Sequence, residues 1–256
     1  SGKWIDESQI IDYVEEDVLM IPDLNTLKKL PWNKEPTAQI ICDLYSNSGA
    51  PSAIAPRQVL TKIIKLLEEN DLKAIVAPEL EFYLCEKNLD PNIPLLTPVG
   101  KSGRRANGSD VFGIDSVNEF DIFLDDIYDY CEMLDIGVDT LVHESGPSQI
   151  EINLNHGDPL KLADQTFMFK RAVRQVALKH GIHATFMAKP HQGQPGSSMH
   201  IHQNLVSTKD HKNIFTDLDG KETNAFYQYI GGLQEYLPDA MVFFAPYVNS
   251  YRRFVM

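Results

Sequence analysis

Two histidines and an asparagine alternate with apolar residues in one short stretch of the chain. Residues 196–205 read Gly-Ser-Ser-Met-His-Ile-His-Gln-Asn-Leu. This alternation is typical of a half-buried β-strand, in which His200, His202 and Asn204 project from one face. Two imidazoles on one face, directly after a loop rich in Gly, Pro and Ser, indicate a metal or phosphate site. A polar sheet face explains the same pattern, so the stretch alone leaves both interpretations open.

Carboxylates lie on three predicted strands upstream, and on two of them they alternate with apolar residues in the same way. Glu79 and Glu81 share one face of a strand, Glu144 ends another, and Glu151 lies on the strand that follows a tight turn. The positions behind these acids are aliphatic or aromatic. This pattern predicts a sheet that packs on a core on one side and carries oxygen ligands on the other. Taken singly, each glutamate is explained by an exposed sheet face.

Several carboxylates on one concave face repel one another and raise each other's pKa, and divalent cations relieve that repulsion. Carboxylate oxygens with a few imidazole nitrogens suit Mg²⁺ or Mn²⁺ rather than zinc. Two such ions side by side are a common device for phosphoryl transfer. Near the end of the sequence, Arg252 and Arg253 offer a bidentate clamp for a substrate anion, with solvated surface as the alternative.

Composition narrows the class of protein. The chain has 256 residues, 43% of them hydrophobic, and a net charge of −13. It has no basic stripe for phosphate backbones, so a nucleic-acid partner is not expected. We expect no membrane partner, since no apolar run approaches the roughly 20 residues that span a bilayer. The three cysteines, Cys42, Cys85 and Cys131, are widely spaced, which indicates a reducing, cytoplasmic location.

The elements that would position these residues alternate between strands and helices. Strands are predicted at 18–21, 38–45, 72–77, 79–84, 138–144, 149–154, 182–188 and 199–205. Helices are predicted at 56–70, from a capping box at Ser116 and Glu119 to 134, at 159–180, and at 222–237 and 239–246 around Pro238. Hairpins occur beside crossovers, so the fold class is α+β.

At this point four separated motifs resemble the catalytic domain of the glutamine synthetase family. They are Pro78-Glu79-Leu80-Glu81-Phe82-Tyr83, His143-Glu144 followed by Glu151-Ile152-Asn153, Lys189-Pro190 followed by Gly196–His202, and Asn249-Ser250-Tyr251-Arg252-Arg253. Their order and spacing are similar to the family from about residue 17 onward. Residues 138–151, 186–202 and 245–253 look more like the γ-glutamylpolyamine synthetase-like branch.

The resemblance implies a fold, an assembly and a reaction. The expected fold is a glutamine synthetase-like catalytic domain, a curved antiparallel sheet with flanking helices, over residues 51–256. Residues 1–50 would be the remnant of a β-grasp domain. The family forms ring-shaped homo-oligomers, with a dodecamer among the expected sizes. Its reaction uses ATP to phosphorylate the γ-carboxylate of glutamate, after which ammonia or an amine displaces phosphate. A polyamine such as putrescine is the leading acceptor here.

The resemblance also assigns roles to individual residues. The first Mg²⁺ or Mn²⁺ would be held by Glu81, Glu144 and Glu151. The second would be held by Glu79 and His200. The nucleotide ATP would contact His202, Asn204 and Asp139. Glutamate would meet the backbone of Gly196 and the guanidinium of Arg253.

The sequence departs from the family pattern in two ways. Pro195 stands where the family often has asparagine, so it lacks the amide which that asparagine gives to glutamate. The family's later arginine-rich strand lies outside this sequence, so we expect a catalytic domain that is C-terminally incomplete. Three other functions compete: a glutamine synthetase that uses ammonia, a non-catalytic family member, and a different metal enzyme such as a cupin-like oxygenase. The first two keep the fold, and the third rests only on the His-x-His pair.

Overall fold

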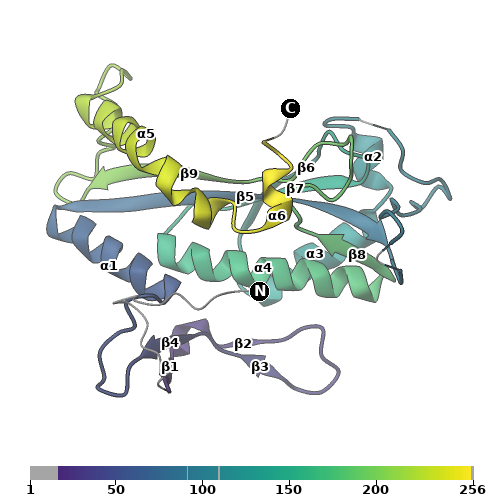
Figure 1. Ribbon diagram of the computed structural model, residues 1–256, viewed down its shortest axis with the longest axis horizontal. Coiled ribbons are helices and arrows are strands. Elements are labelled where there is room, and N and C mark those ends of the chain that lie inside the picture. The colour runs from purple at the N-terminus through teal and green to yellow at the C-terminus, as the bar shows by residue number, and fades with distance from the viewer. Residues whose placement is uncertain (1–16, 91, 109, 255–256) are drawn as a thin grey trace.

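The computed structural model describes residues 17–90, 92–108 and 110–254. Figure 1 shows a central sheet with α1, α3 and α4 on one side, α5 and α6 on the other, and a small β-rich unit beyond α4. The strands are β1 (Leu19–Pro22), β2 (Lys28–Lys29), β3 (Ala38–Gln39), β4 (Cys42–Tyr45), β5 (Leu72–Glu86), β6 (Val138–His143), β7 (Gln149–Leu154), β8 (Ile182–Thr185) and β9 (Met199–Ser207). The helices are α1 (Pro56–Glu69), α2 (Ile114–Asn118), α3 (Asp121–Met133), α4 (Pro159–Lys179), α5 (Asn224–Phe244) and α6 (Val248–Tyr251), with a 3₁₀ turn at Leu24–Thr26.

The central sheet has five strands built around β5, which is 15 residues long. The order is β6-β7-β5, with β9 and β8 sharing the other edge of β5, and all pairs are antiparallel. We predicted two strands here, at 72–77 and 79–84, but one strand runs through Pro78. The Val76 N–H bonds Gly157 on the β7 side. Because alternate N–H groups share a side, the N–H that Pro78 lacks would face that side, before β7 pairing begins at Glu79.

The core lies between this sheet and the helices beneath it. Leu80, Phe82 and Leu84 of β5 are at most 1% exposed, and they face α3 and α4. α3 and α4 contribute apolar residues at helical spacing, which forms one buried stripe on each. These are Phe123, Leu124, Ile127 and Cys131 from α3 and Phe169, Ala172, Val173 and Val176 from α4. The alternation predicted for β5 is therefore confirmed, and its odd-numbered residues are free to face the other side.

Helix boundaries confirm some predictions and correct others. α4 begins at Asp158, whose carboxylate accepts hydrogen bonds from the N–H groups of Leu160 and Lys161, and Gly181 follows with a φ of +74°. The prediction of a capping box at Ser116 and Glu119 is wrong. Ser116 lies inside the short α2 and its hydroxyl donates to Asp110 (2.8 Å), while Glu119 accepts from the backbone of Ser102. Both residues of the predicted box therefore form hydrogen bonds with the preceding loop.

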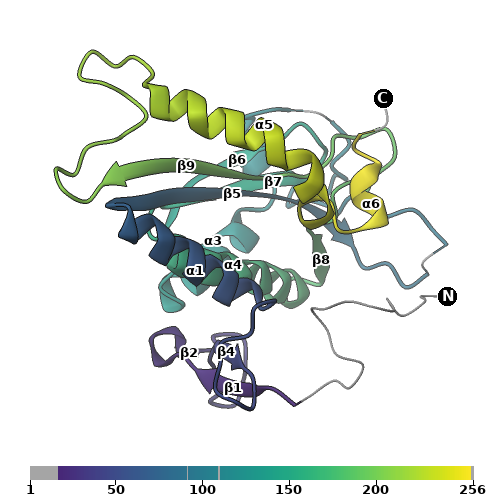
Figure 2. The same cartoon turned by 60° about the vertical axis from the view of Figure 1, so that its left-hand side comes forward.

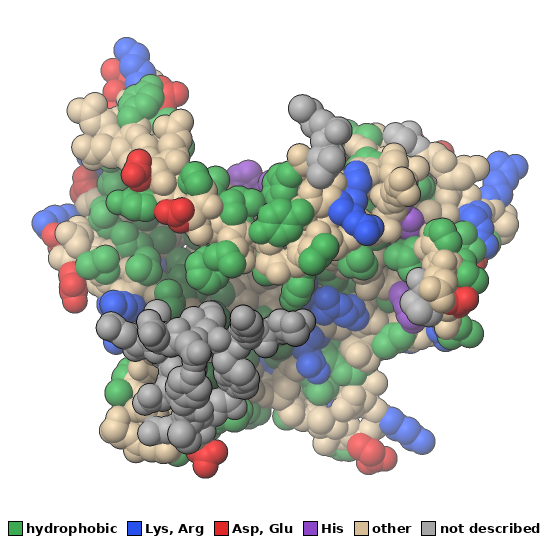
Figure 3. Space-filling model, viewed as in Figure 1, with side chains coloured by type: hydrophobic (Ala, Val, Ile, Leu, Met, Phe, Trp, Pro, Cys, Tyr) green, Lys and Arg blue, Asp and Glu red, His purple; other side chains and the backbone are tan. Residues whose placement is uncertain are grey.

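Three further element predictions need correction. The stretch 38–45 forms two short strands, because β3 and β4 pair with different partners. The predicted strand 182–188 ends at Thr185. The two helices expected around Pro238 form one helix, α5, with this proline inside it. α5 has no buried residue among those described and carries exposed apolar side chains, part of the green surface in Figure 3.

The N-terminal unit consists of two small two-stranded sheets, β1 with β4 and β2 with β3. Figure 2 shows it set apart from the central sheet, beyond α1 and α4. Its identity as a β-grasp remnant stays a prediction. Residues 1–16 of the predicted first domain lie outside the described residues. Among the described residues, no helix combines the length and the apolar character that crossing a membrane requires.

Candidate metal and substrate site

Strand register places four of the five predicted metal ligands in neighbouring rows across the sheet, and the fifth, Glu144, follows the end of β6. Asn153 of β7, Glu79 of β5 and His200 of β9 form one row. Glu151 and Glu81 form the next, two residues along the strands or about 7 Å away. All of them face away from the core, because Leu80 and its apolar neighbours on β5 occupy the opposite face. The structure thus brings three strands of predicted ligands onto one surface.

Glu79, Glu151 and His200 form the tightest group. One ligand atom from each lies within 4.8 Å of the other two. Nδ1 of His200 lies 3.1 Å from Oε2 of Glu79, and Nε2 of His202 lies 2.7 Å from its Oε1. The resemblance assigned Glu151 to the other metal, with Glu81 and Glu144. In the structure, Glu151 lies diagonally across from Glu79 and stands between the two predicted sets.

Glu81 is the most buried of these acids, at 8% exposure. Burial raises its pKa, and the charge of Glu144 adds to the rise, while a hydrogen bond with the backbone of Ser198 opposes it. Burial also raises the pKa of Glu151, followed by the charges of Glu79, Glu144 and Glu81. The mutual repulsion expected from the sequence is therefore present. Carboxylate oxygens with one imidazole nitrogen are a donor set that fits a hard divalent cation.

Arg253 and Gly196 meet beside these carboxylates. The guanidinium of Arg253 donates from Nη1 to the carbonyl of Ser197 (2.8 Å) and from Nη2 to the hydroxyl of Ser198 (2.7 Å). Its charge acts to lower the pKa of Glu81. A Cβ on Gly196 would lie 2.6 Å from the carbonyl oxygen of Ala188 and 2.8 Å from Nε of Arg253. A side chain at this position would clash with these atoms, so the close approach of the backbone requires glycine at 196.

The three residues assigned to the nucleotide lie in two places. His202 and Asn204 are on β9, and Oδ1 of Asn204 is buried with no hydrogen-bond partner among the described residues. Such an orphaned polar atom suits a ligand contact. Asp139 is the extra, exposed residue of a bulge in β6, between Val138 and Thr140. β7 and β5 separate β6 from β9, so Asp139 lies about 14 Å away across the sheet.

The structure adds three residues to the site, all of which hold the loop 189–198. Tyr83 donates its hydroxyl to the carbonyl of Pro195 (2.9 Å). Asn249 makes two hydrogen bonds, of 2.8 and 2.9 Å, with the backbone of Lys189. Gln149 contacts both Glu81 and Gly196. Tyr83 and Gln149 share the face of the predicted ligands, and that alternation was the signal available in the sequence.

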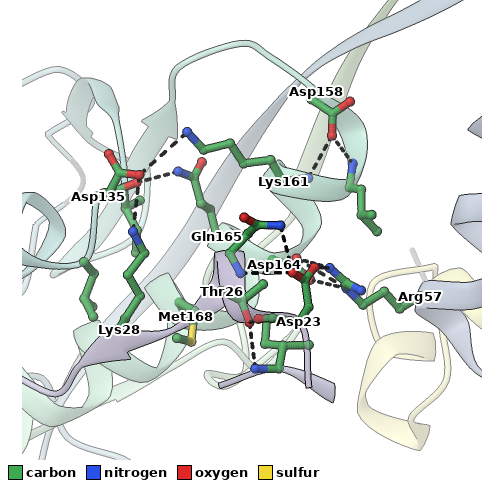
Figure 4. Close-up of a pocket in the computed structure, with 15 residues that line it drawn as sticks. Asp23, Thr26, Lys28, Arg57, Asp135, Asp158, Lys161, Asp164, Gln165 and Met168 are labelled. Atoms are coloured by element: carbon green, nitrogen blue, oxygen red, sulfur yellow. Dashed lines mark hydrogen bonds and ion pairs between the residues drawn. The ribbon is translucent and has the colours of Figure 1, made fainter. Parts of the chain in front are cut away.

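A separate cavity lies away from this face. It has a volume of about 380 Å³ and lies between the N-terminal unit and α4. Figure 4 shows the residues that line it. Its lining includes Asp23, Arg57, Asp164 and Asp135, and its charged groups are paired with one another. It contains none of the predicted ligands. The carboxylate face, rather than this cavity, is the candidate site, because it carries the predicted ligands and because, in the described part of the chain, Glu81 and Glu151 form no salt bridge.

Comparisons with known proteins find relatives in both sequence and fold. The chain is 36% identical to the gamma-glutamylputrescine synthetase PuuA of Escherichia coli over 94% of this chain and 51% of that protein. It is 32% identical to a glutamate–isopropylamine ligase of a Pseudomonas species, over 93% and 51%. A solved structure described as apo GmaS without ligand matches with a TM-score of 0.80 and 27% identity, over 95% of this chain and 56% of that one.

The fold that the resemblance implied is thereby confirmed for the catalytic part. The chain spans about half the length of the curated relatives it matches. The sequence model described as the catalytic domain of glutamine synthetase matches residues 53–256, which include every predicted ligand. This chain belongs to the glutamine synthetase family.

Proposed function

We propose that the protein is an ATP-dependent ligase that joins the γ-carboxylate of glutamate to an amine, with a polyamine such as putrescine as acceptor. The observation that carries the proposal is the group of mutually repelling carboxylates on β5 and β7, with His200 beside it. Two similar proteins are named for amine acceptors, putrescine and isopropylamine. Their names support an amine in place of ammonia.

Two Mg²⁺ or Mn²⁺ ions are proposed on this face. Glu81, Glu144 and Glu151 would hold the first, and Glu79 and His200 the second. When bound, the ions would neutralise charge that develops on the phosphoryl oxygens. Glu151 stands close enough to Glu79 and His200 to serve both sets.

The remaining site residues would orient the substrates. The proposed ATP contacts are His202 and Asn204 on β9 and Asp139 on β6, two strands that β5 and β7 separate. Gly196 and Arg253 would bind glutamate, the arginine by its guanidinium on a carboxylate. The γ-carboxylate oxygen attacks the γ-phosphorus of ATP and ADP leaves. The amine nitrogen then attacks the acyl carbon, loses a proton, and phosphate leaves. Positioning and charge neutralisation suffice, so no nucleophilic side chain is needed.

The assembly and domain division are also proposals. Family membership supports a cytoplasmic ring of identical subunits, with a dodecamer among the sizes to test by light scattering. The family match begins at residue 53, which supports a boundary between an N-terminal domain at 1–50 and a catalytic domain at 51–256.

The test is a substrate comparison with the full-length protein. Purified enzyme is incubated with ATP, glutamate and Mg²⁺, with either putrescine or ammonia, and phosphate release and product mass are measured. We expect phosphate and a γ-glutamyl amide of putrescine. Turnover with ammonia alone would favour glutamine synthetase, the second candidate, which the family description motivates. A protein that binds Mn²⁺ but turns over neither acceptor would be a non-catalytic member.

A further inference from the structure

We propose that Gln149 is a positioning residue that couples the first metal site to the glutamate-binding loop, an inference that rests on the proposed function. Gln149 begins β7 and is 1% exposed. Its Oε1 accepts from the N–H of Gly146 (2.9 Å). Its Nε2 donates to Oε2 of Glu81 (2.9 Å) and to the carbonyl of Gly196 (3.1 Å). One buried amide therefore joins three segments.

The orientation of this amide follows from its partners. The Gly146 N–H can only donate, so the amide oxygen must face the hairpin turn. The two hydrogens of Nε2 are then directed at two acceptors, the carboxylate of Glu81 and the carbonyl of Gly196. Every hydrogen-bonding atom of the side chain has a partner, so rotation of the amide would break three hydrogen bonds at once. This makes Gln149 a fixed point in the site.

The two groups that accept hydrogen bonds from Nε2 of Gln149 have different proposed roles. Glu81 is a proposed metal ligand, and its bond to Gln149 is charge-assisted, so it restrains the direction of the carboxylate. Gly196 is proposed to present backbone to glutamate, and it is also crowded by Ala188 and Arg253. A shift of Gly196 when glutamate binds would move the amide, and the amide would turn Glu81. The physical link is one NH₂ group shared between two acceptors.

The same hairpin provides a matched control. Ser148 precedes Gln149 and is 0% exposed. Its hydroxyl donates to the carbonyl of Leu84 (2.8 Å), so it also ties the hairpin to β5. Among the described residues, the Ser148 hydroxyl makes no hydrogen bond with Glu81 or with the loop 189–198. Replacing Ser148 with alanine loosens the hairpin without touching the proposed link.

The experiment measures the linkage between glutamate and Mn²⁺ in the full-length protein. Mn²⁺ affinity is determined by electron paramagnetic resonance with and without glutamate, and the KM for glutamate is measured in parallel. In the wild type, glutamate should tighten Mn²⁺ binding by about 5-fold or more. In Gln149→Met, this coupling should fall below about 2-fold and the KM for glutamate should rise about 10-fold. Ser148→Ala should keep the wild-type coupling.

Gln149→Asn is a second variant should the methionine variant fail to fold, since it keeps a neutral amide but is one CH₂ group too short to reach Glu81 and Gly196 together. It should lose the coupling as well. Wild-type coupling that persists in a folded Gln149 variant would overturn the inference and leave the proposed function intact. A wild type that binds no Mn²⁺ would instead overturn the proposed function, and the inference with it. The two failures are therefore distinguishable.

Discussion

Acidic side chains cluster in two regions of the molecule, and only one of the two clusters surrounds an arginine. At the junction between the N-terminal unit and α4, Asp23, Asp43 and Asp164 surround Arg57 at 2.5, 2.7 and 3.1 Å. Figure 4 shows Asp23 and Asp164 directed at its guanidinium. On the sheet face, Glu79 contacts two histidines, whereas Glu81 and Glu151 form no salt bridge with any residue that the structure describes.

The pKa shifts follow this difference. The hydrogen bond from Arg57 is the main cause that lowers the pKa of Asp23. Burial raises the pKa of Glu81 and Glu151, and neighbouring carboxylates add to it. Acids that carry their own cation hold two parts of the fold together. Acids that lack one are poised for a cation from solution, which is why we place function on the sheet face.

Removal of a proposed ligand should give the largest effect. Glu79→Ala takes away the carboxylate that contacts both His200 and His202. We expect kcat/KM for ligation to fall about 100- to 1000-fold, since charge neutralisation at the phosphoryl group is lost. Glu235→Ala, at an exposed position on α5, is the control and should keep wild-type activity. Equal activity of the two variants would contradict the assignment of Glu79.

Loss of the central cation in the other region should chiefly affect folding. Arg57→Ala leaves three half-buried carboxylates facing one another. We expect the free energy of unfolding to fall by about 2–4 kcal/mol, measured by urea denaturation. Arg104→Ala, at an exposed arginine, should change it by less than about 0.5 kcal/mol. The comparison between regions fails here if both variants unfold alike.

Neutralising one acid in each region should give opposite signs. In metal-free protein, Glu151→Gln removes a charge whose neighbours repel it, so the free energy of unfolding should rise by up to about 1 kcal/mol. Asp164→Asn removes a partner of Arg57, so the free energy of unfolding should fall by about 1–2 kcal/mol. Both are read from urea denaturation at pH 7. Destabilisation by both substitutions would remove the distinction between the regions.

The pH dependence should be the smallest effect. The folded-state pKa of Glu151 is raised above 4.5, so its penalty is present at pH 7 and is relieved as pH falls through that folded pKa. The advantage of Glu151→Gln over wild type should therefore shrink toward pH 4.5. The folded-state pKa of Asp23 is lowered below 3.8, so its stabilisation is lost only as pH falls through that lower value. An advantage that is constant between pH 7 and 4.5 would speak against a raised pKa.

The two regions also differ in what the sequence could predict. Alternation placed Glu79 and Glu81 on one face because the residues between them are apolar. The closeness of Glu151 to Glu79 and His200 depends on strand register, which alternation does not specify. Arg57 and Asp164 are 107 residues apart, and no local pattern links them. The local pattern at Ser116 gave a wrong prediction, because its hydroxyl donates to Asp110 and does not cap a helix.

Metal binding tests the central claim most directly. Calorimetric titration of the full-length, metal-free protein with Mn²⁺ should detect two ions per subunit. Glu79→Ala and Glu151→Ala should each weaken at least one ion about 100-fold or more, whereas Asp43→Asn should leave both unchanged. Mn²⁺ binding that survives unaltered in both glutamate variants would contradict the account.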